Sequence, residues 1–446
     1  MRWLLLFCLF AISTEAAQDD ARYDPKKLLL DVRQKVMATV NRLPKYMCTE
    51  TIDRSTFQPE AKVTNHSCDD LAARRKKANW KIRRDASDRL RLDVAVSGGS
   101  EMFSWVGENS FEDRSLADLV RSGATSTGAF ATFIGGIFGT NAASFTYNGD
   151  VSADGRAFVE FGFRVPLEKS GYNIGNKLYH ANVPYYGTFL VDPETLDLVR
   201  LIIHADQLPP EIDACEDTTT LDYGIVRLNN ADFLLPKNSV LRVVNNDGSE
   251  FENRSVFSSC HEFLGESTLR FDAAPDDRQA AAEKRNLAPL TLPAGLQFTL
   301  ALTSAIETAT AAAGDLITAK LTSPIKEGHN KILVPKGAVV SGRIVQIERL
   351  YEKASQSLLL AVRPETIEIG GIPQPFAARL DSIVEAPVTR RFARPSGLLR
   401  RQDLGRFDQM ADPQDAAGGL LRFENVTGHY VIQRGLELQG STVAAK

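Results

Sequence analysis

The sequence lacks the short motifs that identify most catalytic and metal sites. Its 446 residues contain no G-x-S-x-G turn, which would present a serine nucleophile, and no H-E-x-x-H segment, which would bind zinc. The six histidines are scattered, and we interpret each as a surface or hydrogen-bonded side chain. We therefore predict no catalytic residue, no metal ligand and no cofactor.

Neither sign of charge is in large excess. The chain has 52 Lys and Arg residues against 56 Asp and Glu residues, which gives a formal net charge of −4. A domain that binds nucleic acid usually carries a clear basic excess, so we expect no nucleic-acid partner. Beyond the N-terminus, no segment has the roughly 20 consecutive apolar residues that a membrane-spanning helix needs.

The first 17 residues have the order of a secretory signal peptide. Arg2 gives a positive start, residues 3–12 are apolar, and small residues follow as far as Ala16 and Ala17. An alternative interpretation is a buried N-terminal strand. We predict an exported bacterial protein, periplasmic or secreted, that is cleaved near Ala16 or Ala17.

Cysteine usage agrees with export. Cys8 lies inside the signal peptide, and the four other cysteines are Cys48, Cys68, Cys215 and Cys260. An even number of cysteines in an exported chain predicts two disulfides. Three pairings are open, and we favour Cys48–Cys68 with Cys215–Cys260 because each of these pairs is close in the sequence.

Residues 18–270 predict a mainly β domain that begins with a helix. Apolar residues recur at helical spacing over Pro25–Leu43. Many strand-like segments follow, and in Arg156–Val165 apolar and other residues alternate as in a half-buried strand. The composition of residues 271–290 predicts an exposed linker.

Residues 291–446 predict a second mainly β domain, with a long disordered loop near 383–420. Most strand-like segments of this domain precede the loop, and one last strand follows it. The chain is thus expected to consist of two β domains that are joined by the linker.

A run of small and apolar residues, 123–140, interrupts the strands of the first domain. One interpretation is a helical plug that packs on the sheet, and the other is a mobile apolar lid over a ligand groove. For the second interpretation, the predicted lining residues come from the plug and from one strand: Phe130, Phe133, Ile137, Phe138, Phe161 and Phe163.

Basic residues dominate the segment 74–91. One interpretation is a solvated loop followed by strands with polar outer faces. The other is contact with an anionic membrane or envelope surface. The residues predicted for that contact are Arg74, Arg75, Lys76, Lys77, Arg83 and Arg84.

Two segments of the first domain carry a family resemblance. The hairpin Phe189–Leu201, with Asp192-Pro193-Glu194-Thr195 at its turn, and the stretch Tyr223–Pro236 resemble the periplasmic lipoprotein-carrier and outer-membrane lipoprotein-sorting superfamily. The resemblance covers roughly residues 40–270. It implies a curved antiparallel half-barrel whose concave apolar face, plugged by helices, accepts lipid chains.

The second domain carries a different resemblance. The ordered segments Leu292–Leu296, Ala313–Asp315 and Leu333–Arg343 are similar to the periplasmic β-barrel domain of conjugation and type IV secretion channel proteins. The similarity covers about residues 286–380 and implies a small β-barrel. Together the two resemblances indicate a bacterial exported protein.

The predicted fold is therefore mainly β, with a curved antiparallel half-barrel sheet and a helical plug, followed by a small β-barrel domain. The leading functional hypothesis is a non-catalytic envelope protein that binds an apolar or lipid ligand, or a partner protein, on the concave sheet. The alternatives are a structural or assembly scaffold of the cell envelope and an exported hydrolase. The expected partners are a lipid or an envelope protein, and an anionic membrane surface.

Overall fold

The computed structural model describes residues 23–444 except 65–66, 109–110, 112–115, 121–122, 131, 154, 177, 263–291, 329–330, 353–354, 385–394 and 397–418. The predicted signal peptide, the predicted linker and most of the loop predicted near 383–420 lie outside the described residues. None of the described helices is both long enough and apolar enough to cross a membrane.

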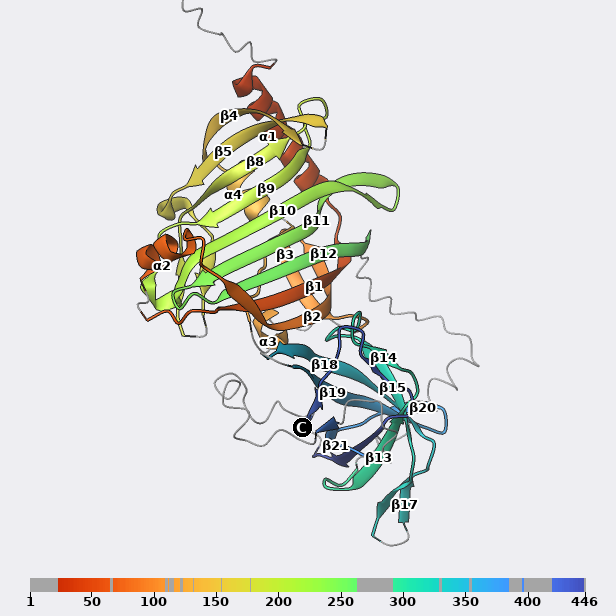
Figure 1. The fold of residues 1–446 in the computed structure, drawn as a ribbon. Helices are drawn as coiled ribbons and strands as arrows, with labels where there is room; N and C mark the ends of the chain where they lie inside the picture. Colours follow the sequence, from red (N-terminus) through yellow and green to blue (C-terminus); the bar gives the residue numbers. More distant parts are fainter. Residues whose placement is uncertain are drawn as a thin grey trace, which may run out of the picture.

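Within the described residues, nineteen strands form one sheet that runs through both halves of the chain (Figure 1). The N-terminal part of this sheet has ten strands, each paired with the next in the order β4 (Ser144–Ala153), β5 (Arg156–Val165), β8 (Tyr185–Val191), β9 (Leu198–Ala205), β10 (Ala214–Leu228), β11 (Ala231–Asn245), β12 (Glu250–Glu262), β1 (Tyr46–Pro59), β2 (Ile82–Ser97) and β3 (Ser100–Trp105). All of these ladders are antiparallel, which confirms the expected mainly β fold with a large curved sheet.

The C-terminal part of the sheet has nine strands. Its main ladder follows the order β21 (Ala378–Ile383), β25 (Glu437–Thr442), β13 (Gln297–Leu302), β15 (Leu316–Leu321), β18 (Val339–Tyr351) and β19 (Gln356–Ile369). The far edge of β19 pairs with β20 (Ile372–Pro375) and with β23 (Leu420–Glu424), which also holds β22 (Pro395–Ser396). Among the described residues no ladder joins β21 to β19, so this curled sheet differs from a closed barrel.

Short elements complete the fold. Among the described residues, three two-stranded sheets pair β6 (Asn173–Gly175) with β7 (His180–Asn182), β14 (Ile306–Glu307) with β24 (Val431–Ile432), and β16 (Ile325–Glu327) with β17 (Lys331–Val334). The helices are α1 (Pro25–Arg42), α2 (Cys68–Arg75), α3 (Leu116–Leu119) and α4 (Thr132–Phe138), with 3₁₀ turns at Leu167–Lys169 and Pro210–Ile212.

Helix α1 begins and ends where the sequence predicts. The Asp24 carboxylate accepts hydrogen bonds from the amides of Lys26 and Lys27, and Pro25 occupies the first turn, where its missing N–H costs nothing. Leu28, Val32 and Val36 are buried on one side of the helix. They share a hydrophobic core with α4 and strands β5, β8, β9 and β10, so α1 and α4 cover one face of the sheet, here named the helix-covered face.

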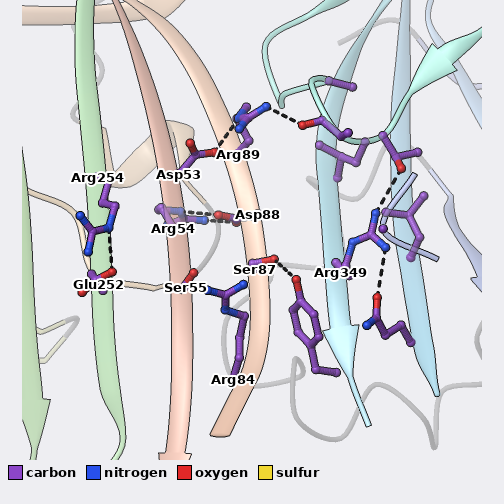
Figure 2. A pocket seen from close by; sticks show the side chains of 18 residues that line it. Asp53, Arg54, Ser55, Arg84, Ser87, Asp88, Arg89, Glu252, Arg254 and Arg349 are labelled. Atoms are coloured by element: carbon purple, nitrogen blue, oxygen red, sulfur yellow. Dashed lines mark hydrogen bonds and ion pairs between the residues drawn. The ribbon is translucent and has the colours of Figure 1, made fainter. Parts of the chain in front are cut away.

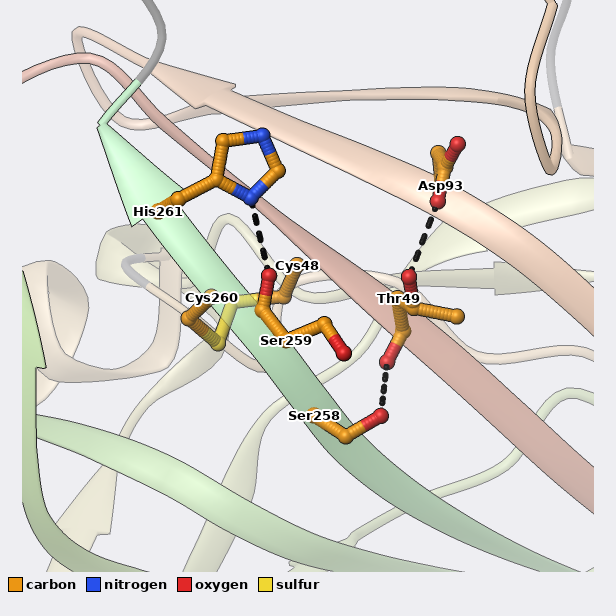
Figure 3. The surroundings of a disulfide bond; sticks show 7 residues. All are labelled: Cys48, Thr49, Asp93, Ser258, Ser259, Cys260 and His261. Carbon is orange, nitrogen blue, oxygen red and sulfur yellow. Dashed lines mark hydrogen bonds between the residues drawn. A yellow bond between two sulfur atoms is a disulfide. The ribbon is translucent and has the colours of Figure 1, made fainter.

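The two disulfides link strands and helices that are distant in the sequence. Cys48 pairs with Cys260, and Cys68 pairs with Cys215. The favoured pairing of sequence neighbours is therefore wrong. β12 returns to lie beside β1, with Thr49 opposite Ser258, and this brings Cys260 to Cys48 (Figure 3). Cys68 ties α2 to the start of β10.

The two parts of the sheet are joined edge to edge. Residues Ala86–Asp88 of β2 pair with Glu348–Leu350 of β18, although β2 also pairs with β1 over its whole length. The Ala313 backbone bonds to both Arg89 and Arg91 of β2. This continuous sheet fixes the position of one part against the other. The domain boundaries themselves stay predictions.

Candidate ligand site on the helix-covered face

The predicted plug is helix α4 together with the segment that precedes it. The helix has only seven residues, T-F-I-G-G-I-F, and four of them are buried: Phe133, Ile134, Ile137 and Phe138. Arg33 of α1 donates to the carbonyl oxygens of Phe138 and Thr140, which holds the end of α4 against α1. The plug is thus a short apolar element between α1 and the sheet.

The structure brings five of the six predicted lining residues into one core. Phe133, Ile137 and Phe138 from the plug pack with Phe161 and Phe163 from β5. Phe189 of β8 links the plug to β5, since its ring centroid lies 5.0 Å from that of Phe138 and 5.4 Å from that of Phe161. Such contacts are typical of a close-packed interior.

Phe130 belongs to the adjacent core. Its ring packs edge-on against Tyr46 at 5.8 Å and against Phe257 at 4.7 Å. All six predicted residues are at most 5% exposed. Three clefts of about 470, 400 and 190 Å³ lie elsewhere on the described residues, and none of them is lined by any of these six. In this structure the plug therefore fills the helix-covered face.

Buried polar groups lie beneath the plug segment, and they were not found by sequence reasoning. The hydroxyl oxygens of Tyr46 and Tyr223 are buried and have no hydrogen-bond partner among the described residues. Burying an unpaired hydroxyl costs about 1–3 kcal/mol, so these groups are unusual in a core. The alternation of residues along β1 could have indicated that Tyr46 is buried, because position 46 shares a face with the buried Cys48 and Ile52.

Two glutamates accompany these hydroxyls. Glu50 of β1 is 6% exposed, and burial raises its pKa to about 7, against a hydrogen bond from Ser255 that lowers it. Burial also raises the pKa of Glu101 of β3. The Glu101 carboxylate accepts hydrogen bonds from the backbone amides of Gly128 at 2.7 Å and Phe130 at 2.9 Å. Glu101 therefore ties the plug segment to the sheet.

A third carboxyl with a raised pKa, Asp217, lies farther along the same face. The Tyr172 hydroxyl donates to Asp217 of β10 at 2.8 Å. Burial raises the pKa of Asp217 to about 6, although this hydrogen bond acts in the opposite direction. Tyr172 also packs edge-on against Phe133 of the plug, with 5.2 Å between ring centroids. The floor under α4 thus combines aromatic rings with protonatable groups.

The six basic residues predicted to contact an anionic surface lie on two elements, and that contact stays a prediction. Arg75 turns inward and pairs with Glu216 and Glu250, beside a cleft of about 400 Å³. Lys76 and Lys77 are exposed after α2, and Arg74 is half-buried. Arg83 and Arg84 lie on β2 instead, where the two parts of the sheet meet.

Within the described residues, no group of three or more His, Cys, Asp or Glu side chains is placed to hold a metal ion. No family model matches the chain, and no curated protein matches it. Function must therefore be argued from the residues of this chain.

Three solved structures are similar to part of the chain. A DUF1329 family protein from Desulfovibrio piger matches with 10% identity and a TM-score of 0.27, over 56% of this chain and 98% of that chain. A LolA superfamily protein from Nitrosomonas europaea matches with 10% identity and a TM-score of 0.25, over 56% and 96%.

A putative outer membrane lipoprotein-sorting protein domain from Vibrio parahaemolyticus matches with 10% identity and a TM-score of 0.26, over 58% of this chain and 99% of that chain. These names are those of the superfamily that the N-terminal residues resemble. The resemblance of residues 286–380 to a secretion-channel domain stays a prediction.

Proposed function

We propose that this chain is an exported, non-catalytic binding protein that takes up an apolar chain with a polar end on its helix-covered face. The plug, α4 with residues 123–130, moves away from the sheet to admit the ligand and then covers it as a lid. The proposed lining residues are Phe130, Phe133, Ile137, Phe138, Phe161 and Phe163. Two disulfides suit such a protein to an oxidising compartment, and we propose the periplasm.

One observation carries the proposal. The unpaired hydroxyls of Tyr46 and Tyr223 lie in the interior of a face lined mainly by apolar side chains, together with the carboxyls of Glu50 and Asp217, whose pKa values are raised. A core that served packing alone would gain stability from phenylalanine at both tyrosine positions. A ligand with a polar end would pair with these groups while its chain contacts the aromatic rings.

The plug is suited to displacement. It is short, and the described polar contacts that hold it come from the side chains of Glu101, Asn253 and Arg33, so displacing it breaks no strand ladder. Displacing it exposes a face whose rings already stack on one another, so the floor needs no rearrangement. The ligand then replaces the plug in contact with the aromatic rings of the sheet, so the net change in buried apolar area stays small.

Native mass spectrometry of the mature protein, purified gently from its own export route, tests for a bound ligand after organic extraction. Amide hydrogen exchange with added oleate then locates the site. We expect oleate to raise exchange in residues 128–138 and to leave strands β13 and β25 unchanged. Strands β13 and β25 serve as the control because they belong to the separate C-terminal core.

Two results would contradict the proposal. In the first, the protein carries no extractable apolar molecule and takes up no oleate, which favours an envelope scaffold. In the second, oleate binds but exchange in α4 stays as it was, which places the ligand on an outer surface.

A further inference from the structure

A charged cleft of about 470 Å³ lies where the two parts of the sheet meet (Figure 2). Strands β1, β2 and β12 form one wall, and β18 and β19, with residues near 308–311 and Gly428, form the other. Alternation along β1 places Asp53 and Ser55 in this cleft, on the opposite face from the buried Ile52. The cleft is therefore distinct from the proposed apolar site.

The lining of the cleft has more arginines than carboxylates. Five arginines contribute, and they come from β1, β2, β12 and β18: Arg54, Arg84, Arg89, Arg254 and Arg349. Three carboxylates face them: Asp53, Asp88 and Glu252. Two positive charges are thus in excess inside one concave site.

Each of the three carboxylates already has an arginine. Arg89 pairs with Asp53 at 2.5 Å, and Arg254 pairs with Glu252 at 2.9 Å. The Arg54 Nε atom donates to Asp88 at 2.8 Å. Figure 2 shows these pairs side by side across three neighbouring strands. They leave the charges of Arg84 and Arg349 without a carboxylate from the lining of the cleft.

Arg349 of β18 is held by neutral acceptors alone among the described residues. Its Nη1 atom donates to the Thr427 carbonyl oxygen at 2.7 Å and to Gln356 Oε1 at 3.2 Å, and its Nη2 atom donates to Thr308 Oγ1 at 3.2 Å. These contacts orient the guanidinium group and leave its charge uncompensated.

Arg84 of β2 is placed by two aromatic rings. Its Cζ atom lies 5.6 Å from the ring centroids of both Phe57 and Tyr351, and the described residues give it no carboxylate partner. Contact with rings fixes the plane of a guanidinium group and leaves its N–H edge available. The Tyr351 hydroxyl is in turn 3.0 Å from Ser87 Oγ, which fixes the ring.

We propose that this cleft binds a phosphate monoester. Such a group carries a charge of about −1.5 to −2 at pH 7, which matches the two uncompensated guanidinium groups. Arginine N–H groups pair with phosphate oxygens in a fork geometry, and the Ser55 and Ser87 hydroxyls line the same cleft. Its volume lies within the range of roughly 300–1,000 Å³ that is usual for small-molecule sites.

The ligand would contact both parts of the chain at once. Arg84 comes from β2 of the N-terminal part, and Arg349 comes from β18 of the C-terminal part. The inference does not depend on the proposed apolar site, because the two sites share none of their lining residues. A phosphate ester would therefore bind whether or not the plug moves.

Titration calorimetry with inorganic phosphate and glycerol 1-phosphate tests the site, and flotation with phosphatidylcholine vesicles, with and without phosphatidic acid, tests a membrane-held monoester. We expect Arg84→Gln to weaken binding at least tenfold. Arg84 is exposed, so the variant should keep the wild-type melting temperature. Arg227→Gln is the matched control, because Arg227 is an exposed arginine on β10 outside the cleft.

Binding of the soluble esters that R84Q weakens supports a free phosphate ester as ligand. Binding only to vesicles with phosphatidic acid, again weakened by R84Q, supports a lipid headgroup. The proposal is overturned if wild-type protein binds none of these probes, or if R84Q binds them as tightly as R227Q does.

Discussion

Glu348 of β18 lies directly opposite Asp88 of β2, in the ladder that joins the two parts of the sheet. Glu348 is 9% exposed, and burial raises its pKa to about 7. The negative charges of Asp88 and Asp85 act in the same direction, while a hydrogen bond from Gln346 and the charge of Arg54 oppose them. Two carboxyls thus face each other where the parts of the chain meet.

This pair predicts how stability depends on pH. Between about pH 4.5 and 7 the folded protein keeps a proton on Glu348 that the unfolded chain releases, so the free energy of unfolding falls as pH rises through this window. We expect Glu348→Gln to be more stable than wild type at pH 8, by roughly 1–3 kcal/mol, and similar to wild type at pH 4.5.

Urea unfolding at both pH values measures this difference. Glu368→Gln is the control, because Glu368 is an exposed glutamate on the next strand. Equal gains from E348Q at pH 4.5 and pH 8 would show that the effect is packing rather than titration.

A second prediction concerns the bond between β3 and the plug. Glu101→Ala leaves the buried amides of Gly128 and Phe130 without their acceptor, which costs about 1–3 kcal/mol. If the plug is displaceable, the loss should appear as faster hydrogen exchange in residues 128–138 and as tighter oleate binding. Phe376→Ala also truncates a buried side chain, but in the C-terminal core, and it should change neither. A uniform rise of exchange across the sheet in E101A would count against a separable plug.

The sequence predicts local structure well and long-range pairing poorly. Alternation predicts β5 over Arg156–Val165, and helical spacing with Pro44 predicts the end of α1, because each pattern depends on neighbours along the chain. The pairing of β2 with β18 joins residues about 260 positions apart, and the residue pattern of neither strand identifies the strand with which it pairs. The same limit explains the wrong disulfide pairing, since the return of β12 beside β1 is a property of the whole sheet.

The residues of the candidate sites also fall into those that a local sequence pattern predicts and those that depend on long-range contacts. The plug phenylalanines were predicted because a run of small and apolar residues is visible in the sequence. Arg84 was found in the basic segment, but Arg349 was not, because its role depends on contacts that exist only in the folded chain, where it is an arginine without a carboxylate from the lining of the cleft. Glu101 was missed for the same reason.

A third prediction follows from the disulfides. Proteolysis without reduction should release one pair of linked peptides that contains Cys48 and Cys260, and another that contains Cys68 and Cys215. Replacing Cys48 and Cys260 together by alanine should lower the free energy of unfolding by about 2–5 kcal/mol, since this bridge closes a long loop. A linked peptide pair that contains Cys48 and Cys68 would contradict the observed connectivity.

The last prediction concerns the contact of Gly314 with β2. Its φ of +109° is unfavourable for other residues, and a Cβ atom there would lie 2.1 Å from the Arg91 carbonyl oxygen. Gly314→Ala must therefore push residues 313–315 away from β2 and break the Ala313 hydrogen bonds to Arg89 and Arg91. Gly295 is the matched control, because its φ is +88° but nothing lies within 4 Å of the added atom.

We expect Gly295→Ala to cost about 1 kcal/mol, from the backbone conformation alone, and Gly314→Ala to cost clearly more. Small-angle scattering should also show a larger radius of gyration for G314A, because the contact between the two parts of the sheet is weakened. Arg343 lies on the same contact, with its Nη1 atom donating to the carbonyl oxygens of Val106 and Gly314, so displacement of this loop also leaves a buried guanidinium group short of an acceptor. Equal melting temperatures for G314A and G295A would show that residues 313–315 do not hold the two parts together.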